Sequence, residues 1–178
     1  MIRIRPAHES DVEAVSALTV AAYRSEGFAS PDYLARLADA RDRYEHAILL
    51  VAIAEDALAG TVTVAPPGSP WQQVARPHEH ELRMLAVDPR YRGLGIGTAL
   101  VRTCQCEPEL GPPQGLVACT LDSMTGAHRI YRSLGFVRDP ARDWQPTATS
   151  WLRAFAWSSG AGGDVDPPGR AETRPGPR

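Results

Sequence analysis

Three glycines at alternate positions, Gly93, Gly95 and Gly97, follow Arg92 and precede an apolar helical pattern that opens at Thr98. Each glycine costs about 1 kcal/mol relative to alanine in a helix, so helix packing alone does not account for them. Without a Cβ the chain can bend tightly, and a ligand can approach amides that lack partners at the positive end of a helix. The stretch therefore predicts a site for phosphate oxygens, with Arg92 adding a charge beside it.

Two common phosphate-binding motifs do not fit this stretch. A dinucleotide fingerprint needs its third glycine where Thr98 stands. A Walker A loop needs a lysine, and the chain has none, because all 19 basic residues are arginines. A different phosphate ligand bound in the same loop remains an alternative at this point.

The loop resembles the acetyl-CoA loop of the GNAT family of N-acetyltransferases. That loop has the form Q/R-x-x-G-x-G/A, which Arg92, Gly95 and Gly97 match, after a strand that ends at Val87 and Asp88. In the family the loop amides hold the diphosphate of coenzyme A. Taken alone, this match would be weak.

A second stretch, about 30 residues later, strengthens the resemblance. Ala127, Tyr131, Gly135 and Phe136 match the form A-x-x-x-Y-x-x-x-G-F of the same family. Many members carry asparagine where this chain has Met124, so a side-chain hydrogen bond to the pantetheine arm is expected to be missing or to be replaced by one from Asp122 or Ser123. Both motifs in the right order, with a strand between them, indicate the family's fold and acyl-CoA binding.

The resemblance implies a mixed α/β (α+β) fold. Its central sheet would be mostly antiparallel, with six to seven strands, a splayed parallel pair and about four flanking helices. The co-substrate implied is acetyl-CoA, with no metal. The residues that would bind it are Leu85, Ala86, Val87, Arg92, Gly93, Leu94, Gly95, Ile96, Gly97, Thr98, Ala127 and Tyr131.

Acetyl transfer to an amine needs two proton movements, and two residues are candidates for them. An amine with a pKa near 10.4 is neutral in only about one molecule in 2,500 at pH 7, so a general base helps. By resemblance that base is Glu81; the alternative is a glutamate that is solvated or paired with Arg83. Tyr131 occupies the position of the family's general acid, which would protonate the leaving thiolate; the alternative is a packed core tyrosine.

The acceptor side of the cleft is less well defined. By resemblance, Tyr23, Phe28 and Tyr33 would cover it, and Trp71 lies in a long loop that could form a pocket wall. For Tyr23, Phe28 and Tyr33 the alternative is that the aromatic ring fills the core. The sequence does not say whether the acceptor is an antibiotic, a polyamine, an amino acid or a protein N-terminus.

Hydrophobic periodicity predicts the elements that position these residues. Strands are expected at 2–5, 48–54, 59–65, 82–87, 116–121 and 151–157. Helices are expected at 12–22, 31–43, 98–106 and 124–134. In the second helix Tyr33, Leu34 and Leu37 should face inward, whereas Arg41 and Arg43 should stay in solvent.

Composition excludes several classes of function. A net charge of -2 and a pI near 6.2 give no basic field for nucleic acid or an anionic membrane. No apolar leader or membrane-spanning stretch is visible, so we expect a cytoplasmic protein. Cys104, Cys106 and Cys119 are expected to be free thiols. The cluster from His78 to Glu81 is not expected to bind metal, because strand neighbours point to opposite faces.

We therefore expect one GNAT domain over residues 1–157 and a disordered tail rich in glycine, proline and arginine over residues 158–178. The expected activity is transfer of an acetyl group from acetyl-CoA to an amine of a small molecule or peptide, by direct attack in a ternary complex. The alternative is a non-catalytic acyl-CoA-binding module. The resemblance also admits a homodimer.

Overall fold

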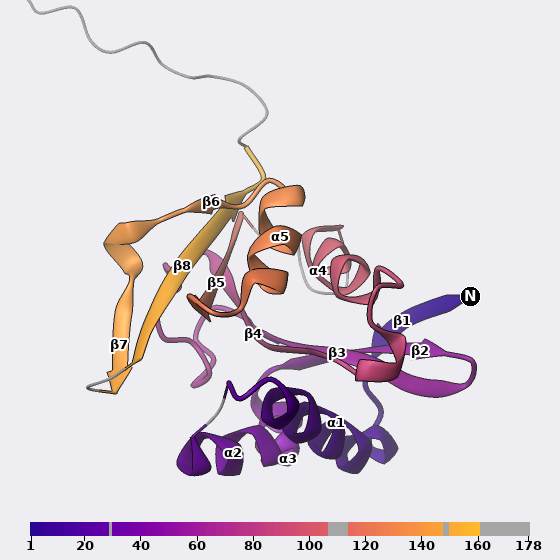
Figure 1. Ribbon diagram of the computed structural model, residues 1–178. Coiled ribbons are helices and arrows are strands. Elements are labelled where there is room, and N and C mark those ends of the chain that lie inside the picture. The colour runs from indigo at the N-terminus through magenta and orange to yellow at the C-terminus, as the bar shows by residue number, and fades with distance from the viewer. Residues whose placement is uncertain (29, 107–113, 148–149, 161–178) are drawn as a thin grey trace, which may run out of the picture.

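The computed structural model describes residues 1–28, 30–106, 114–147 and 150–160 (Figure 1). Nearly all of the expected tail, residues 161–178, lies outside them. In chain order the elements are β1 (Ile2–Pro6), α1 (Val12–Ser25), α2 (Pro31–Ala38), α3 (Ala40–His46), β2 (Ile48–Ala54), β3 (Ala57–Ala65), β4 (Glu79–Val87), α4 (Ile96–Cys106), β5 (Gly115–Leu121), α5 (Thr125–Ser133), β6 (Val137–Arg138), β7 (Trp144–Thr147) and β8 (Ser150–Ser158).

The expected fold class is confirmed. One mixed sheet has the order β1-β2-β3-β4-β5-β8-β6, with β7 paired to β8, and β4 and β5 are the parallel neighbours. The described residues form eight strands and five α-helices, slightly more than expected. The additional strands, β6 and β7, are only two and four residues long and form by pairing with β8. Such short strands leave little periodic pattern in the sequence.

The sheet lies between two layers of helices (Figure 1). Helices α4 and α5 cover one face, where Leu100 and Val101 pack with Leu116 and Phe155 in the largest core cluster. Helices α1, α2 and α3 cover the other face over two smaller clusters. Apolar side chains on both sheet faces explain why β2, β3 and β5 are rich in hydrophobic residues, whereas β4 begins with the buried polar residues Glu79, His80 and Glu81.

Strands β4 and β5 pair over only a short distance. Their parallel register joins 79–82 to 115–118, and beyond that point no pairing connects the two strands. On its other edge β4 contains a bulge, because Thr61 pairs with Ala86 while Thr63 pairs with Arg83. Met84 lies within the bulge and has a φ of 52°, a conformation that costs energy for a residue with a side chain. The C-terminal half of β4 therefore leaves its neighbour and is locally twisted.

The expectation that Arg43 stays in solvent is wrong. The predicted helix over 31–43 breaks at Asp39, whose φ and ψ of -83° and 66° lie outside the helical region. The break redirects the chain into α3, and the Arg43 side chain becomes fully buried. Its guanidinium donates to the Leu37 carbonyl at 2.8 Å and the Thr63 hydroxyl at 3.4 Å. Burial lowers the pKa of Arg43 to about 10.

The three cysteines are free, as expected, but they differ in environment. Cys104 is buried on the inner face of α4, Cys119 on β5 is half-buried, and Cys106 is exposed. Burial raises the pKa of both Cys104 and Cys119 to about 12. Both buried thiols are therefore poor nucleophiles at neutral pH.

Gly60 allows α4 to pack closely against β3, and its replacement provides a test of this packing. A Cβ at Gly60 would lie 2.8 Å from Ile96 Cγ2 and 3.1 Å from the Ala86 carbonyl oxygen. We expect Gly60→Ala to lower the free energy of unfolding by about 1–3 kcal/mol, measured by urea denaturation. Gly126→Ala is the matched control, because nothing lies within 4 Å of its Cβ position. Equal midpoints for the two variants would contradict the close approach.

Candidate functional site

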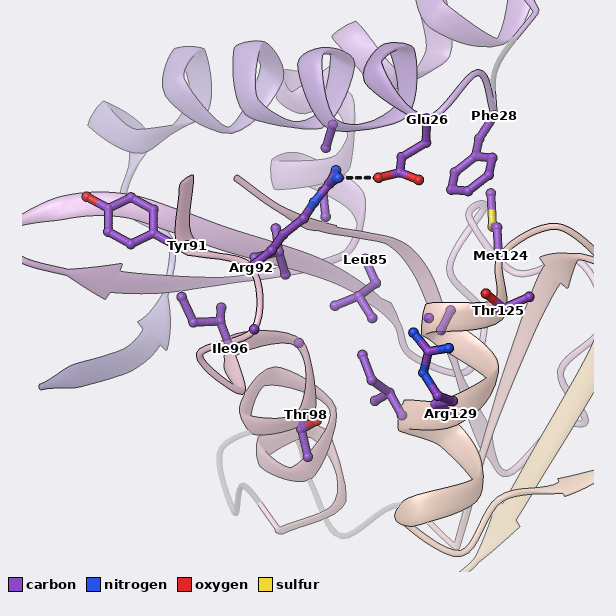
Figure 2. A pocket seen from close by; sticks show the side chains of 18 of the residues that line it. Glu26, Phe28, Leu85, Tyr91, Arg92, Ile96, Thr98, Met124, Thr125 and Arg129 are labelled. Carbon is purple, nitrogen blue, oxygen red and sulfur yellow. Dashed lines mark hydrogen bonds and ion pairs between the residues drawn. The ribbon is translucent and has the colours of Figure 1, made fainter. Parts of the chain in front are cut away.

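A cavity of about 700 Å³ opens between the end of α1, the separated half of β4, the glycine loop and α5 (Figure 2). This volume lies in the range of cavities that hold small ligands and cofactors. Most residues expected to bind the co-substrate line it: Leu85, Ala86, Val87, Arg92, Gly93, Gly95, Ile96, Gly97, Thr98 and Ala127. Leu94, which is 61% exposed, and Tyr131, which is buried, do not.

The glycine loop combines two structural roles. Gly93 and Gly95 have φ values of 78° and 77°, which residues with a side chain rarely adopt, so the turn itself requires glycine. At Gly97 the reason is space, because a Cβ would lie 2.8 Å from Ile130 Cδ1 of α5. The Ala99 amide donates to the Gly95 carbonyl at 2.9 Å, and the amides that precede it have no intrahelical acceptor. The loop thus presents unpaired N–H groups beside the cavity.

The separated half of β4 supplies a second set of backbone groups. Leu85, Ala86 and Val87 line the cavity, and their β5-facing edge has no strand partner in the described part of the chain. An extended ligand could pair with this edge as an additional strand would. The cavity therefore offers main-chain donors from both a helix terminus and a strand edge.

One ion pair crosses the cavity mouth. Arg92 of the glycine loop donates to the Glu26 carboxylate, just beyond the end of α1, and lies 3.4 Å from the Ser25 hydroxyl (Figure 2). The side chains of Arg92 and Glu26 are 42% and 37% exposed, so solvent weakens their attraction. A phosphate group bound by the loop would compete with Glu26 for Arg92.

Several lining residues were missed by the sequence analysis. Glu26, Thr125 and Arg129 all line the cavity, next to Met124, which was expected near the pantetheine arm. In Figure 2 the Phe28 ring and the Met124 side chain point toward one another from opposite sides. The motif on α5 could have pointed to Thr125 and Arg129, since they flank Ala127. No local pattern marks Glu26, which reaches the site through the path of the chain after α1.

Tyr131 is buried next to the cavity rather than in its lining. Its side chain is 3% exposed, and its ring centroid lies 5.2 Å from that of Phe136 and 5.9 Å from that of Phe155. Burial raises the pKa of Tyr131, so its hydroxyl keeps its proton at neutral pH. Within the described residues no hydrogen bond engages this hydroxyl. The packing is that of a core tyrosine, and its role as general acid stays a prediction.

Glu81 is buried and held by the loop that precedes its strand. Its Oε2 atom accepts the amides of Gln73, Val74 and Ala75 at 2.7, 2.9 and 3.2 Å, and Oε1 lies 3.6 Å from Arg83 Nη1. The side chain is outside the cavity lining. This geometry does not support a general-base role, because the carboxylate would have to leave three amides to reach a substrate. The alternative expectation, a pairing with Arg83, is the arrangement found.

The four aromatic candidates for acceptor binding separate into two pairs. Tyr23 and Phe28 line the cavity, whereas Tyr33 and Trp71 do not. Trp71 is 4% exposed and packs in a core cluster with Leu37. Trp71 is therefore a core residue rather than a cavity wall.

Among the residues that the structure describes, no three histidine, cysteine or acidic side chains are grouped closely enough to hold a metal ion. In the same residues, no helix has both the length and the apolar composition needed to cross a bilayer.

A protein-family model described as "Acetyltransferase (GNAT) family" matches residues 12–136 of the chain. The chain belongs to this family. The match includes the glycine loop, the separated half of β4 and the motif on α5. The cavity therefore lies where three parts of the matched GNAT domain meet.

Solved structures with the same fold cover most of this GNAT chain. An acetyltransferase of the GNAT family from Streptococcus agalactiae aligns with a TM-score of 0.68 at 15% identity, covering 88% of this chain and 95% of its own. The ribosomal-protein-S18-alanine N-acetyltransferase of Escherichia coli aligns with a TM-score of 0.66 at 21% identity, covering 89% and 94%. The yncA protein of Salmonella typhimurium, solved with its cofactor acetyl-CoA, gives 0.62 at 20% identity, covering 89% and 94%.

A curated relative is similar in sequence over part of its length. It is an uncharacterized N-acetyltransferase of Schizosaccharomyces pombe, 39% identical over 93 residues, which are 51% of this chain and 52% of the relative. This GNAT chain therefore matches about half the length of that relative. The similarity supports the family and leaves the acceptor open.

The role found for Glu81 can be tested by removing its charge. We expect Glu81→Gln to lower the free energy of unfolding by about 1–3 kcal/mol, because one carboxylate bonds three amides and lies beside Arg83. Urea denaturation followed by circular dichroism measures this change. Glu45→Gln on the exposed side of α3 is the control and should change little. A Glu81→Gln protein as stable as the control would contradict the anchoring role.

Proposed function

We propose that the protein transfers an acetyl group from acetyl-CoA to a primary amine of a small molecule or peptide. The observation that carries the proposal is the convergence of the glycine-loop amides and the unpaired edge of β4 on one cavity. Acetyl-CoA in the structure of the yncA protein supports it, because that protein has the same fold. Direct attack within a ternary complex is the mechanism proposed.

The residues present fit coenzyme A. The amides between Gly93 and Thr98, with Arg92, would hold the diphosphate at the positive end of α4. The free edge from Leu85 to Val87 would bond the amides of the pantetheine arm. Met124 stands where many members have asparagine, so the pantetheine contact at that position would be apolar, with Ser123 next to it in the cavity lining.

The reaction needs one bond to form and one to break. The neutral amine nitrogen attacks the carbonyl carbon of the thioester, a C–N bond replaces the C–S bond, the nitrogen loses a proton and the sulfur gains one. A backbone N–H of the segment from Leu85 to Val87 would polarise the carbonyl oxygen. Tyr131, which keeps its proton at neutral pH, would supply the proton to sulfur.

Thiol release in the presence of acetyl-CoA and a panel of amines and peptides tests the proposal. Acceptor-dependent release above the hydrolysis background is the expected result. Absence of release with every acceptor, while coenzyme A still binds, would favour a non-catalytic acyl-CoA-binding module. Absence of coenzyme A binding would contradict both functions.

Replacing Tyr131 by phenylalanine tests the proton donor. We expect kcat to fall by about 100-fold, with little change in the KM for acetyl-CoA, because the hydroxyl is needed only as sulfur leaves. Stability should be almost unchanged, since no hydrogen bond engages this hydroxyl within the described residues. Tyr44→Phe on α3 is the matched control. Equal rates for the two variants would leave Tyr131 with a packing role only.

The ion pair at the cavity mouth gives a separate prediction. If a diphosphate displaces Glu26 from Arg92, then Glu26→Gln should tighten coenzyme A binding by up to about fivefold, the effect of an exposed ion pair. Arg92→Gln should weaken binding. Isothermal titration at low salt measures both, and the gain from Glu26→Gln should shrink at high salt. Weaker binding by Glu26→Gln would show that the pair instead supports the site.

A further inference from the structure

One wall of the cavity continues into a cluster of aromatic and apolar side chains that the proposed chemistry does not use. Tyr23 lines the cavity and also packs in the cluster formed by Leu37, Trp71 and Met84. Its ring lies 6.2 Å from that of Tyr33 in an edge-on arrangement. Tyr23 is thus the surface through which this cluster faces a bound acceptor.

Three guanidinium groups enter the same cluster. Arg43 is fully buried, with Nη1 3.0 Å from the Met84 sulfur. Arg83 Nη1 donates to the Trp71 carbonyl at 3.0 Å, and its guanidinium lies 5.8 Å from the indole centroid. Arg36 lies 5.1 Å from the same indole. Arg43 and Arg83 are therefore two cations near Tyr23 with little exposure to solvent.

The negative charge available to balance these cations is small. Within the described residues, Glu81 is the carboxylate that pairs with Arg83, and no carboxylate lies within 4.0 Å of Arg43. Glu81 already accepts three amides, which reduces its effect on Arg83. Asp39 also attracts Arg43, but Asp39 is exposed and its side chain caps α3. A buried cation normally has an anion as its partner, which cancels its potential. Here the compensation is incomplete, so the potential inside the cluster stays positive.

The Tyr23 hydroxyl is a hydrogen-bond donor that a ligand could meet close to these positive charges. Burial raises the pKa of Tyr23, so its O–H keeps its proton and can donate. No hydrogen bond occupies this hydroxyl within the part of the chain that the structure describes. A donor without an acceptor, in front of excess positive charge, is suited to an anionic oxygen.

We propose that the acceptor carries a carboxylate next to its amine, as an amino acid does, and that the Tyr23 hydroxyl binds this carboxylate in front of Arg43 and Arg83. The inference rests on the proposed acetyl transfer and narrows its substrate class. Polyamines and other polycations are disfavoured by the same charges.

The same potential would assist the reaction without Glu81. A positive potential favours the neutral form of a bound amine, so it lowers the pKa of the acceptor's ammonium group. More of the acceptor is then ready to attack at neutral pH. Arg83 would act here as a positioning residue, through the field and through Tyr23, without touching the reacting atoms.

The test compares matched acceptors, namely phenylalanine, phenylalaninamide and phenethylamine, and the corresponding derivatives of methionine and glutamine. We expect kcat/KM, from thiol release, to be at least about tenfold higher for the acid than for the amide or amine. Tyr23→Phe should remove most of this preference by raising the KM of the acids alone. Tyr44→Phe is the control and should keep the preference.

Arg83 variants separate an electrostatic role from a structural one. Arg83→Gln should reduce the preference for acids and move the acidic limb of the kcat profile to higher pH, because the bound ammonium regains a higher pKa. Arg83→Lys keeps the charge and should restore both. Melting temperatures of the variants identify any loss of folding.

Calorimetric binding of the same acceptors to the protein saturated with coenzyme A gives a readout independent of turnover. Tighter binding of the acids, lost in Tyr23→Phe, supports the inference. Amides or amines that bind or react as well as the acids overturn it and leave acetyl transfer intact. Lack of binding by every acid also overturns it. Failure of the acetyl transfer itself would show instead as absent thiol release across the whole amine panel.

Discussion

The early separation of β4 from β5 is the constraint on which the rest of the site depends. Four residue pairs join these strands in parallel, and the bulge at Met84 then twists β4 away. A sheet interior would normally satisfy its backbone groups with a neighbouring strand. Here one edge of β4 is left for a ligand, and the glycine loop that follows β4 carries the next set of unpaired amides to the same place.

The arginines near the cavity differ in how completely carboxylates neutralise their charge. At the cavity mouth Arg92 has a full partner in Glu26, in an exposed pair that a bound phosphate can replace. Deeper in the protein, Glu81 lies beside Arg83 but also accepts three amides. The close partners of Arg43 are backbone carbonyls, the Met84 sulfur and the Thr63 hydroxyl, none of which carries a formal charge. The arginines are thus less fully neutralised by carboxylates in the cluster behind Tyr23 than at the cavity mouth. Such a gradient suits a co-substrate and an acceptor that both carry negative groups.

The sequence predicted what local spacing controls. Alternate glycines and an apolar helix after a strand define the loop around Gly95, and helical spacing alone places Tyr131 on α5. Long-range contacts decided the remainder. The Glu81 carboxylate accepts hydrogen bonds from amides six to eight residues earlier in the chain, in a loop whose sequence shows no hydrophobic periodicity. Arg43 is buried because the helix breaks at Asp39, and no glycine or proline at that point predicts the break. Glu26 reaches the cavity through tertiary folding alone.

The cysteine environments determine how cleanly acyl transfer can be followed with disulfide reagents. Such reagents react with thiolates, and a thiol with a pKa of about 12 is ionised in only about one molecule in 10,000 at pH 8. Cys104 and Cys119 should therefore not react with a disulfide reagent while the chain is folded. Cys106, the exposed one, contributes a constant blank of one equivalent per chain, which a serine at that position would remove.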